Sequence, residues 1–475
     1  MVFSTTIFLF AFLPAVIVCY YMQRLLFQKR PGNAVLLFFS YIFYLYGAAG
    51  FLLILLVSTF ADYLLGLLIE RNPRHRRMWL SLSVFLNLGL LVYFKYANFF
   101  VEEINAVVGH FGFSPIEWQH VILPIGISFF TFQKLSYIID VYRRKSRALE
   151  NVFDFALYVA MFPQLIAGPI VRFSFIRDQL RGRSESSDMF YRGIMRFCWG
   201  LAKKVMIASS CGAIADVIFV LDPRLLDTKF AWLGAIAYTL QIYFDFSAYS
   251  DMAIGLGMLF GFKLPENFKR PYSALSITEF WRRWHISLSS WFRDYLYIPL
   301  GGNREGMVKT CINMAVVFIL CGLWHGANWT FLLWGLYHGL FLILERLIGL
   351  RDIPGEKYRF VRRATTLLIV IVGWVFFRSE DISQAIQYLG VMFTASDLPL
   401  SYELSLALNY RNILFMMTAL TVFFMPGDFS GISYLTGKKG PTMLLAGALM
   451  ILLLLPYCAA LIVGGSSSPF IYYRF

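Results

Sequence analysis

Long apolar runs separated by short basic clusters organise the chain, and they predict a helical protein that crosses a membrane many times. A helix needs about 20 mainly apolar residues to cross the hydrocarbon core of a bilayer, and by this measure we expect about eleven spans. The apolar runs cover residues 7–20, 33–48, 50–69, 79–94, 121–142, 192–220, 231–260, 307–347, 364–378, 411–425 and 442–463.

One further apolar stretch, residues 152–171, differs from these spans. Pro163, Gly168 and Pro169 interrupt it, and basic clusters flank it on both sides. Broken backbone at membrane depth is tolerated only where protein or a water-filled cavity covers it. We therefore expect a re-entrant segment beside a cavity.

The charges between the runs orient the predicted spans. Basic clusters at residues 29–30, 71–77, 143–147 and 261–305 are expected on the cytoplasmic side of the membrane. The first run has no positive charge before it and no small-residue cleavage site after it, so we expect a retained span and not a signal peptide. The alternation of basic and acidic loops predicts that both termini lie outside the cytoplasm.

Composition agrees with a membrane protein and excludes several other classes. The 475 residues are 59% hydrophobic and 15% charged, whereas charged residues make up about a quarter of an ordinary soluble domain. The net charge of +14 lies in clusters between apolar runs, so it indicates topology and not a nucleic-acid partner. The six cysteines form no CxxC pair, which predicts neither disulfides nor a metal site.

Residues 307–347 are expected to form a hairpin that enters and leaves from the cytoplasmic side, with His325 near its turn. An ionisable side chain within the membrane is a functional-site hypothesis by default. Gly322 and Gly326 flank the histidine and allow close approach of backbone or ligand, and Asn328 offers donors beside the ring. The alternative is a core histidine hydrogen-bonded to a neighbour. His338 points about 220° away on one continuous helix and is expected to be structural.

A second candidate site follows Ser276, which has capping-box spacing to Glu279 and predicts a helix start. Beyond it the large apolar side chains recur every three or four residues. On one helix, Arg282, His285, Ser289 and Arg293 would share the opposite face within about 80°. We expect an amphipathic helix at the cytoplasmic interface, whose arginines suit a phosphate-bearing donor. A membrane-surface helix with a merely solvated polar face is the alternative.

Two carboxylates, Asp245 and Asp251, lie in or near an apolar run. A proton path is one interpretation, and pairing with cytoplasmic arginines or with hydroxyls such as that of Tyr249 is the other and favoured one. The chain has no G-x-S-x-G elbow, P-loop, Rossmann fingerprint or zinc spacing. This disfavours a covalent serine or cysteine enzyme and a nucleotide-driven pump.

The motifs themselves carry a resemblance to a known family. Residues 270–302 (RPYSALSITEFWRRWHISLSSWFRDYLYIPLGG), the tripeptide Trp324-His325-Gly326 and the segment YFDFSAYSD at 243–251 resemble the membrane-bound O-acyltransferase (MBOAT) family, especially its bacterial branch of polysaccharide O-acetylases. The resemblance implies an all-α MBOAT fold around a central tunnel. It also implies that His325 is the catalytic histidine and that His285 assists from the cytoplasmic side.

Further expectations follow from the resemblance. The donor is acetyl-coenzyme A or an acyl-carrier thioester, with no bound cofactor, and the acceptor is an exported polysaccharide, with alginate expected first. Neutral His325 would take the proton of the attacking hydroxyl. Supporting candidates are Trp324, Asn328, Arg282, Ser289, Arg293 and Asp245, with Asn328 or an indole N–H as oxyanion donor.

The tail, residues 468–475, is similar to a carboxyl-terminal motif of this branch whose tyrosine is proposed to relay the acyl group, and the matching residue is Tyr472. An aromatic interfacial anchor is the alternative. The expected partners are an extracytoplasmic SGNH-type acetyltransferase and membrane lipid, in a bacterial inner membrane.

The expected organisation is one membrane domain over residues 1–475. It comprises amino-terminal spans in 1–150, a catalytic core with His285 and His325 in 151–350, and further spans with an extracytoplasmic tail in 351–475. A proton-coupled transporter or export-channel subunit is the alternative function, although no inverted repeat is visible in the sequence.

Overall fold

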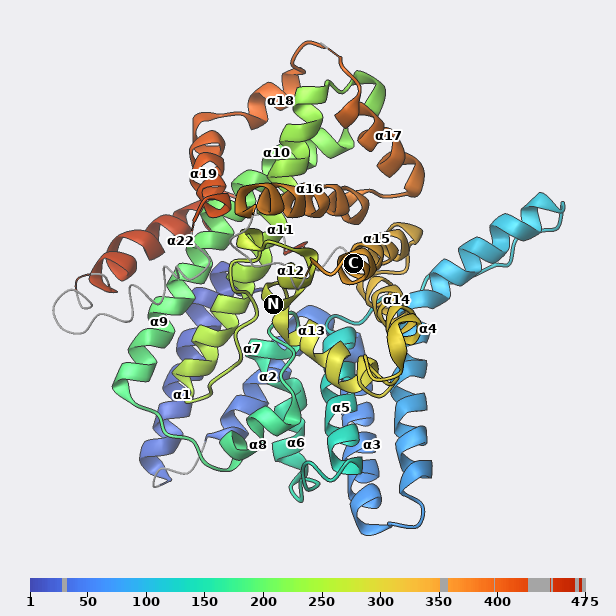
Figure 1. The fold of residues 1–475 in the computed structure, drawn as a ribbon. Helices are drawn as coiled ribbons and strands as arrows, with labels where there is room; N and C mark the ends of the chain where they lie inside the picture. The colour runs from blue at the N-terminus through green and yellow to red at the C-terminus, as the bar shows by residue number, and fades with distance from the viewer. Residues whose placement is uncertain are drawn as a thin grey trace. The chain divides into compact units, whose positions relative to one another are not determined.

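The structure is a computed structural model that describes residues 1–27, 32–350, 358–396, 398–425, 445, 447–465 and 470–471. All regular secondary structure in these ranges is helical (Figure 1). The prediction of an all-α protein is confirmed, whereas the central tunnel stays a prediction.

The chain divides into two compact units. Unit 1 comprises Met1–Gly193 and Leu256–Pro265, and unit 2 comprises Ile194–Gly255 and Glu266–Phe475. Helices α9 (Ser187–Ala202) and α11 (Thr228–Leu259) supply residues to both units. The division of one membrane domain at residues 150 and 350 stays a prediction.

The remaining helices of unit 1 pack mostly against their neighbours in sequence. They are η1 (Phe8–Phe12), α1 (Leu13–Leu26), α2 (Asn33–Ala48), η2 (Ala49–Phe51), α3 (Leu52–Arg71), α4 (Arg76–His110), α5 (Ile127–Tyr142), α6 (Val152–Ala160), α7 (Phe162–Leu165) and α8 (Phe173–Arg181).

Unit 2 is built around the catalytic candidates and carries the carboxyl-terminal helices. Its helices are η3 (Lys203–Ala208), α10 (Ser209–Val220), η4 (Pro223–Leu225), η5 (Pro271–Ser273), α12 (Ile277–Arg283), α13 (Ile286–Phe292), η6 (Arg293–Tyr297), α14 (Gly306–His325), α15 (Trp329–Leu347), α16 (Arg359–Arg378), α17 (Ile382–Phe393), α18 (Tyr402–Ala407), α19 (Tyr410–Leu420), η8 (Thr421–Phe423), η9 (Met450–Leu454) and α22 (Leu455–Val463).

Within the part of the chain that the structure describes, six helical stretches are long and apolar enough to cross a membrane. They are Phe8–Leu26, Asn33–Arg71, Arg76–His110, Gly306–His325, Trp329–Leu347 and Arg359–Arg378. Shorter apolar helices cover Tyr410–Phe423 and Gly447–Val463. The chain is therefore a multi-pass membrane protein, and the count of about eleven spans stays a prediction.

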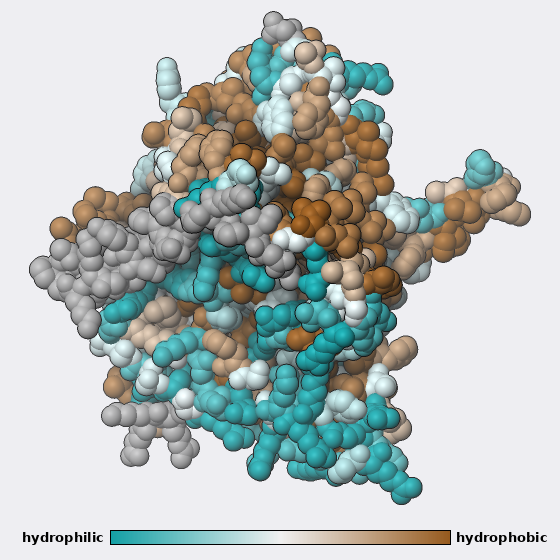
Figure 2. All heavy atoms as spheres, viewed as in Figure 1, coloured by the Kyte–Doolittle hydropathy of each residue, from teal (hydrophilic) through white to brown (hydrophobic). Residues whose placement is uncertain are grey.

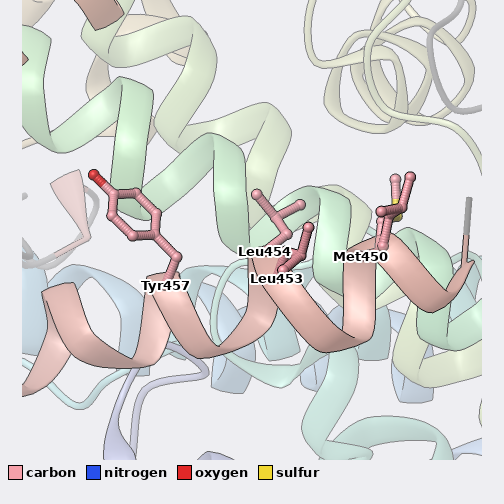
Figure 3. A pocket seen from close by; sticks show the side chains of 5 residues that line it. Met450, Leu453, Leu454 and Tyr457 are labelled. Carbon is pink, nitrogen blue, oxygen red and sulfur yellow. The ribbon is translucent and has the colours of Figure 1, made fainter.

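Exposed apolar side chains mark the faces suited to lipid. Figure 2 shows hydrophobic side chains gathered over α14 and α15 on the visible face. On the helix formed by η9 and α22, Met450, Leu453, Leu454 and Tyr457 line a shallow apolar groove along one side (Figure 3). Such surfaces are stable in a bilayer, where hydrocarbon replaces water as the neighbour of the side chains.

Within unit 1, the predicted break in residues 152–171 is confirmed. Helix α6 ends at Ala160, and Met161 turns the chain into the single turn of α7. Residues 155–171 are buried, so protein covers the broken backbone as the sequence required. The re-entrant path through the membrane stays a prediction.

Helix α4 is much longer than the predicted span of residues 79–94. It continues to His110, and the return segment that follows packs along its second half. There the Asn98 carboxamide binds the backbone N–H of Val121 at 2.9 Å, and Asn105 binds that of Ile116 at 2.7 Å. The predicted span of residues 79–94 is too short, since side-chain hydrogen bonds hold a helix where the apolar run has ended.

Helices α14 and α15 form the hairpin of unit 2 (Figure 1). A Cβ atom at Gly322 would collide with the carbonyl oxygen of Phe331, so glycine permits the two backbones to touch. The carboxylate of Glu345 on α15 accepts the N–H groups of Ile277 and Thr278, the latter at 2.8 Å. It thereby occupies the amino-terminal donors of α12 and ties that helix to the hairpin.

Candidate active site

His325 is the last residue of α14. Gly326 is extended and Asn328 starts α15, so the chain reverses directly after the histidine. The predicted hairpin with His325 at its turn is confirmed. Gly326 faces the ring of Phe331, which leaves no space for a side chain there. The two glycines thus serve close packing of the hairpin itself.

Three aromatic rings enclose the imidazole of His325. The ring centroids of Trp324, Trp334 and Phe377 lie 4.9, 5.0 and 5.2 Å from that of the histidine. The residue is 4% exposed. Aromatic walls exclude water, which strengthens any polar interaction that the imidazole makes.

The predicted continuous amphipathic helix after Ser276 is wrong. The helix starts as expected, with the N–H of Glu279 bound to Ser276 Oγ at 3.0 Å. It then breaks between α12 and α13, because His285 adopts a left-handed backbone conformation with φ of 42°. This conformation is uncommon for any residue other than glycine and is maintained by its surroundings.

The break separates the residues predicted to share one polar face. Arg282 and Arg293 are exposed, whereas His285 is fully buried and Ser289 is half-buried. Arg293 forms an ion pair with Asp294 at 2.7 Å. His285 is therefore not a surface residue beside two arginines, and its environment is set by the interior of unit 2.

Asn267 holds the ring of His285 in one orientation. Its Oδ1 accepts the backbone N–H of Ser287 at 3.2 Å and the Ser287 hydroxyl at 2.9 Å. His285 Nδ1 lies 3.2 Å from the same oxygen. Since this oxygen is an acceptor, Nδ1 carries the proton, and the lone pair of the neutral imidazole is on Nε2.

The Nε2 atom of His285 is buried and has no hydrogen-bond partner within the described part of the chain. Burial also lowers the pKa of His285 to about 3, since desolvation disfavours the imidazolium. The edge of Phe246 covers the ring, with the centroids 4.6 Å apart. The result is a neutral, oriented base whose free nitrogen is shielded from water.

Trp324 brings the two histidines together. Its indole lies 6.1 Å from the ring of His285 and 4.9 Å from that of His325. The two histidine motifs, 40 positions apart in the sequence, therefore both contact one side chain.

Asp245 and Asp251 both pair with cations: Asp251 has an arginine partner, as the favoured interpretation predicted, whereas the partner of Asp245 is a lysine. Asp251 lies 2.8 Å from Arg196 and 2.6 Å from Lys203, and Asp245 lies 2.6 Å from Lys204. The partners come from α9 and η3, so α11 is fixed to these helices by charge pairs. The buried carboxylates are thus held in place by their countercharges.

The end of the described chain docks beside the same helix. The N–H of Ile471 donates to the second carboxylate oxygen of Asp245 at 2.8 Å. Phe470 stacks on Tyr249 with centroids 4.6 Å apart. Because Phe246 touches both Phe470 and His285, Phe470 borders the histidine pocket. Tyr472 itself lies outside the described residues.

Asn328 has a capping role in this structure. Its Oδ1 accepts the N–H of Thr330 at 3.0 Å, and its Nδ2 donates to the carbonyl of Glu380 at 2.7 Å. Its carboxamide is therefore occupied in holding the hairpin.

His338 lies in the same aromatic cluster as His325. Trp334 touches both rings, at 5.2 and 5.0 Å. The expectation that the two histidines point apart assumed one continuous helix and is wrong, because they lie on opposite arms of the hairpin. His338 is fully buried among Trp281, Trp334 and Phe280, in keeping with a packing role.

Comparison with known proteins decides the family. The model of the MBOAT family, membrane-bound O-acyltransferases, matches residues 38–351. The chain belongs to this family. It is therefore a membrane-bound acyltransferase, and the matched segment holds both histidine motifs.

Individual relatives agree over most of the chain. It is 45% identical to the probable alginate O-acetylase AlgI of Pseudomonas putida over the full length of both proteins. It is 48% identical to the protein of the same name from Pseudomonas aeruginosa, over 83% of this chain and 75% of the relative. It is 37% identical to the peptidoglycan O-acetyltransferase of Helicobacter pylori, over 82% and 79% of the two chains.

Sequence reasoning missed several members of this candidate site. Asn267, Phe246, Trp334 and Phe377 contact the histidines, yet no motif in the sequence marks them. Phe246 is the exception, because it lies in the segment 243–251 that carries the family resemblance, and this resemblance could have identified it. Among the described residues, no group of three or more His, Cys, Asp or Glu side chains is arranged to hold a metal ion.

Proposed function

We propose that this acyltransferase moves acetyl groups from a cytoplasmic thioester, acetyl-coenzyme A or an acyl-carrier thioester, across a bacterial inner membrane for the O-acetylation of alginate. The observation that carries the proposal is the convergence of His285 and His325 on Trp324. The names of the relatives support alginate as the polymer.

In the proposed reaction, His325 acts as the general base. An acceptor hydroxyl attacks the carbonyl carbon of the thioester and gives its proton to the imidazole, a C–O bond forms, and the C–S bond breaks. The thiolate leaves and takes up the proton. A positioned base of this kind contributes typically about 10²- to 10⁴-fold in rate.

His285 assists in this proposal by holding a neutral acceptor nitrogen on the donor side. The exposed guanidinium groups of Arg282 and Arg293 suit the phosphates of a nucleotide donor. The indole N–H of Trp324 would donate to the oxyanion that forms as the hydroxyl attacks. Ser289 stays a supporting candidate.

Tyr472 is the proposed acyl relay. It directly follows Ile471, whose backbone is bound by Asp245 beside the histidine pocket, and this attachment supports a tail that reaches the site. Both termini lie outside the cytoplasm in this proposal, so the tyrosine would deliver its acetyl group to an extracytoplasmic SGNH-type partner. That partner acetylates the exported polysaccharide.

The test uses purified full-length protein in lipid nanodiscs with radiolabelled acetyl-coenzyme A. We expect coenzyme A release and an acetyl group on Tyr472, detected by mass spectrometry. Both should fall by about 10²-fold or more in His325→Ala, because the general base is lost. His110→Ala, at the exposed end of α4, is the matched control and should retain the wild-type rate.

Near-normal transfer by His325→Ala at normal protein level would refute the mechanism. The alternative of a proton-coupled transporter predicts no transfer at all in nanodiscs, which hold no gradient. The polymer is tested by restoring acetylation in a strain that lacks its own acetylase, with the acetyl content of alginate as the readout. If donor turnover is normal but alginate stays unacetylated, alginate is excluded as the polymer and the proposed transfer mechanism is not.

A further inference from the structure

A basic pocket of about 420 Å³ opens in unit 1 where α3 ends, α4 begins and α5 ends, with α8 alongside. Its lining includes five cationic side chains, which are Arg76, Arg144, Lys145, Arg147 and Arg177. Glu70 is the one carboxylate in the lining. None of these residues belongs to the site of the histidines.

Backbone geometry gives the pocket its shape. Helix α5 ends at Tyr142, and Arg144, just past this end, has a left-handed conformation with φ of 58°. The N–H of Lys145 then bonds the carbonyl of Asp140 at 2.9 Å, which closes the end of the helix. This reversal turns residues 144–147 back toward the end of α3.

Two long-range hydrogen bonds fix the returning segment. Glu70 on α3 accepts the N–H of Ala148 at 2.8 Å, and the hydroxyl of Tyr63 donates to the carbonyl of Glu150 at 2.6 Å. The carboxylate of Glu70 is thus used by the protein to hold the loop. The pocket is consequently built by the fold and does not depend on a chance approach of flexible side chains.

The charges of the pocket are unbalanced. Arg177 pairs with the exposed Asp178 at 2.8 Å. Arg76 donates to the carbonyl of Tyr142 and lies 4.6 Å above its ring, which orients the guanidinium but leaves its charge. Arg144, Lys145 and Arg147 are exposed at the rim. Cations therefore exceed carboxylates, and the site favours an anion.

The location of the pocket narrows the class of anion. Helices α3 and α4 belong to two stretches able to cross a membrane, so the turn between them lies at the boundary of the bilayer. Its basic residues predict the cytoplasmic side. Figure 2 shows hydrophilic side chains gathered over this turn and the neighbouring ends of α5, α6 and α8. Phosphate is the anion that arginine clusters bind through paired hydrogen bonds.

We propose that this pocket binds a phosphate group at the membrane surface, carried either by an anionic phospholipid headgroup or by a soluble phosphate ligand. Arg76, oriented by Tyr142, provides the inner contact, and Arg144 and Arg147 close over the phosphate from the rim. The site is separate from acyl transfer, so its test does not depend on the proposed function.

The test compares two double variants of the full-length protein. Arg144→Asn/Arg147→Gln removes two rim charges, and asparagine tolerates the left-handed conformation at position 144. Arg71→Gln/Arg74→Gln removes two exposed charges from the same turn that do not line the pocket, and it has the same net charge. Both proteins are purified in detergent, titrated with phosphatidylglycerol or phosphatidylcholine, and analysed by native mass spectrometry.

We expect phosphatidylglycerol binding to weaken about tenfold or more in the pocket variant and less than about threefold in the control. Phosphatidylcholine should bind neither protein tightly. If inorganic phosphate or coenzyme A binds the wild type and the pocket variant loses that binding, while phosphatidylglycerol binding is the same in both, the ligand is soluble. Equal weakening in the two variants, or no change in either with every probe, would overturn the proposal.

Discussion

Two buried ion pairs, one in each unit, use the same chemistry for different purposes. In unit 1, Asp62 on α3 lies 3.3 Å from Lys134 on α5, and both side chains are almost fully buried. The carboxylate also accepts the Nδ2–H of Asn87 at 2.8 Å and a bond from Ser83, both on α4. Every partner is a side chain of a long helix, so the pair links three helices.

In unit 2, Asp245 on α11 is bound by Lys204 at 2.6 Å, and both are again buried. Here the second carboxylate oxygen accepts a backbone N–H from Ile471, far along the chain. The pair of unit 1 is satisfied by its own helix bundle, whereas the pair of unit 2 also receives a segment beside the histidines. The difference indicates that the first pair stabilises the packing of α3, α4 and α5, whereas the second also fixes Ile471 beside α11.

The largest effect is expected from breaking the pair of unit 1. Lys134→Met leaves the Asp62 carboxylate buried without its countercharge, which typically destabilises a protein by about 3–5 kcal/mol. The thermal unfolding transition in detergent should fall sharply, while Lys309→Met, at an exposed lysine, should leave it in place. An unchanged transition in Lys134→Met would mean that the pair does not hold the bundle.

Removing each pair completely sharpens the comparison. In Lys204→Met/Asp245→Leu no buried charge remains, but the Ile471 N–H loses its acceptor, and an unsatisfied buried donor costs about 1–3 kcal/mol. We expect the protein to remain folded, with acetyl transfer to Tyr472 reduced about tenfold or more.

The matched double variant is Lys134→Met/Asp62→Leu. It too removes a buried pair, so its loss of stability should be smaller than that of Lys134→Met alone. Transfer per folded molecule should stay near the wild-type value. Equal loss of transfer in both double variants would contradict a specific role of Asp245 in holding the tail.

A smaller effect is expected from Tyr249→Leu, which removes the ring stacked on Phe470. Such aromatic pairs contribute about 0.5–1.5 kcal/mol, so docking of the tail should weaken about two- to tenfold. Carboxypeptidase digestion of the tail measures this directly. Digestion at the wild-type rate would show that the hydrogen bond to Asp245 alone holds the segment.

The smallest expected effect is on the pH dependence of stability, and it arises from a histidine of unit 2. His285 has a pKa of about 3 in the folded protein, whereas the unfolded chain takes up a proton near its ordinary value of 6.5. Stability therefore falls as pH drops below 6.5, and this histidine accounts for about a threefold change in the unfolding equilibrium between pH 7 and 6. His285→Gln should show a correspondingly weaker acid dependence, measured by unfolding in detergent. An unaltered dependence would contradict the neutral state of His285.

The sequence was sufficient for the hairpin and for the general character of the site. The apolar run 307–347 with basic clusters at both ends predicted the hairpin of α14 and α15 with His325 near its turn. The pairing of Asp251 with an arginine also followed, because unpaired charges are too costly in an apolar environment.

The break at His285 lay beyond such reasoning. Local periodicity favoured one helix, and the left-handed conformation results from Asn267, which binds both the imidazole and the first turn of α13. A contact between segments 18 residues apart has no signature in the helical pattern. The same holds for α4, which continues as a helix past the apolar run 79–94 while its side-chain amides bind a return segment.

The bond between Glu345 and α12 has a mechanical consequence. A helix advances by about 1.5 Å and turns by about 100° for each residue, so a shift of α15 by a single position would remove the carboxylate from both N–H groups at once. Sliding of the hairpin past α12 is therefore coupled to the loss of two charge-assisted hydrogen bonds.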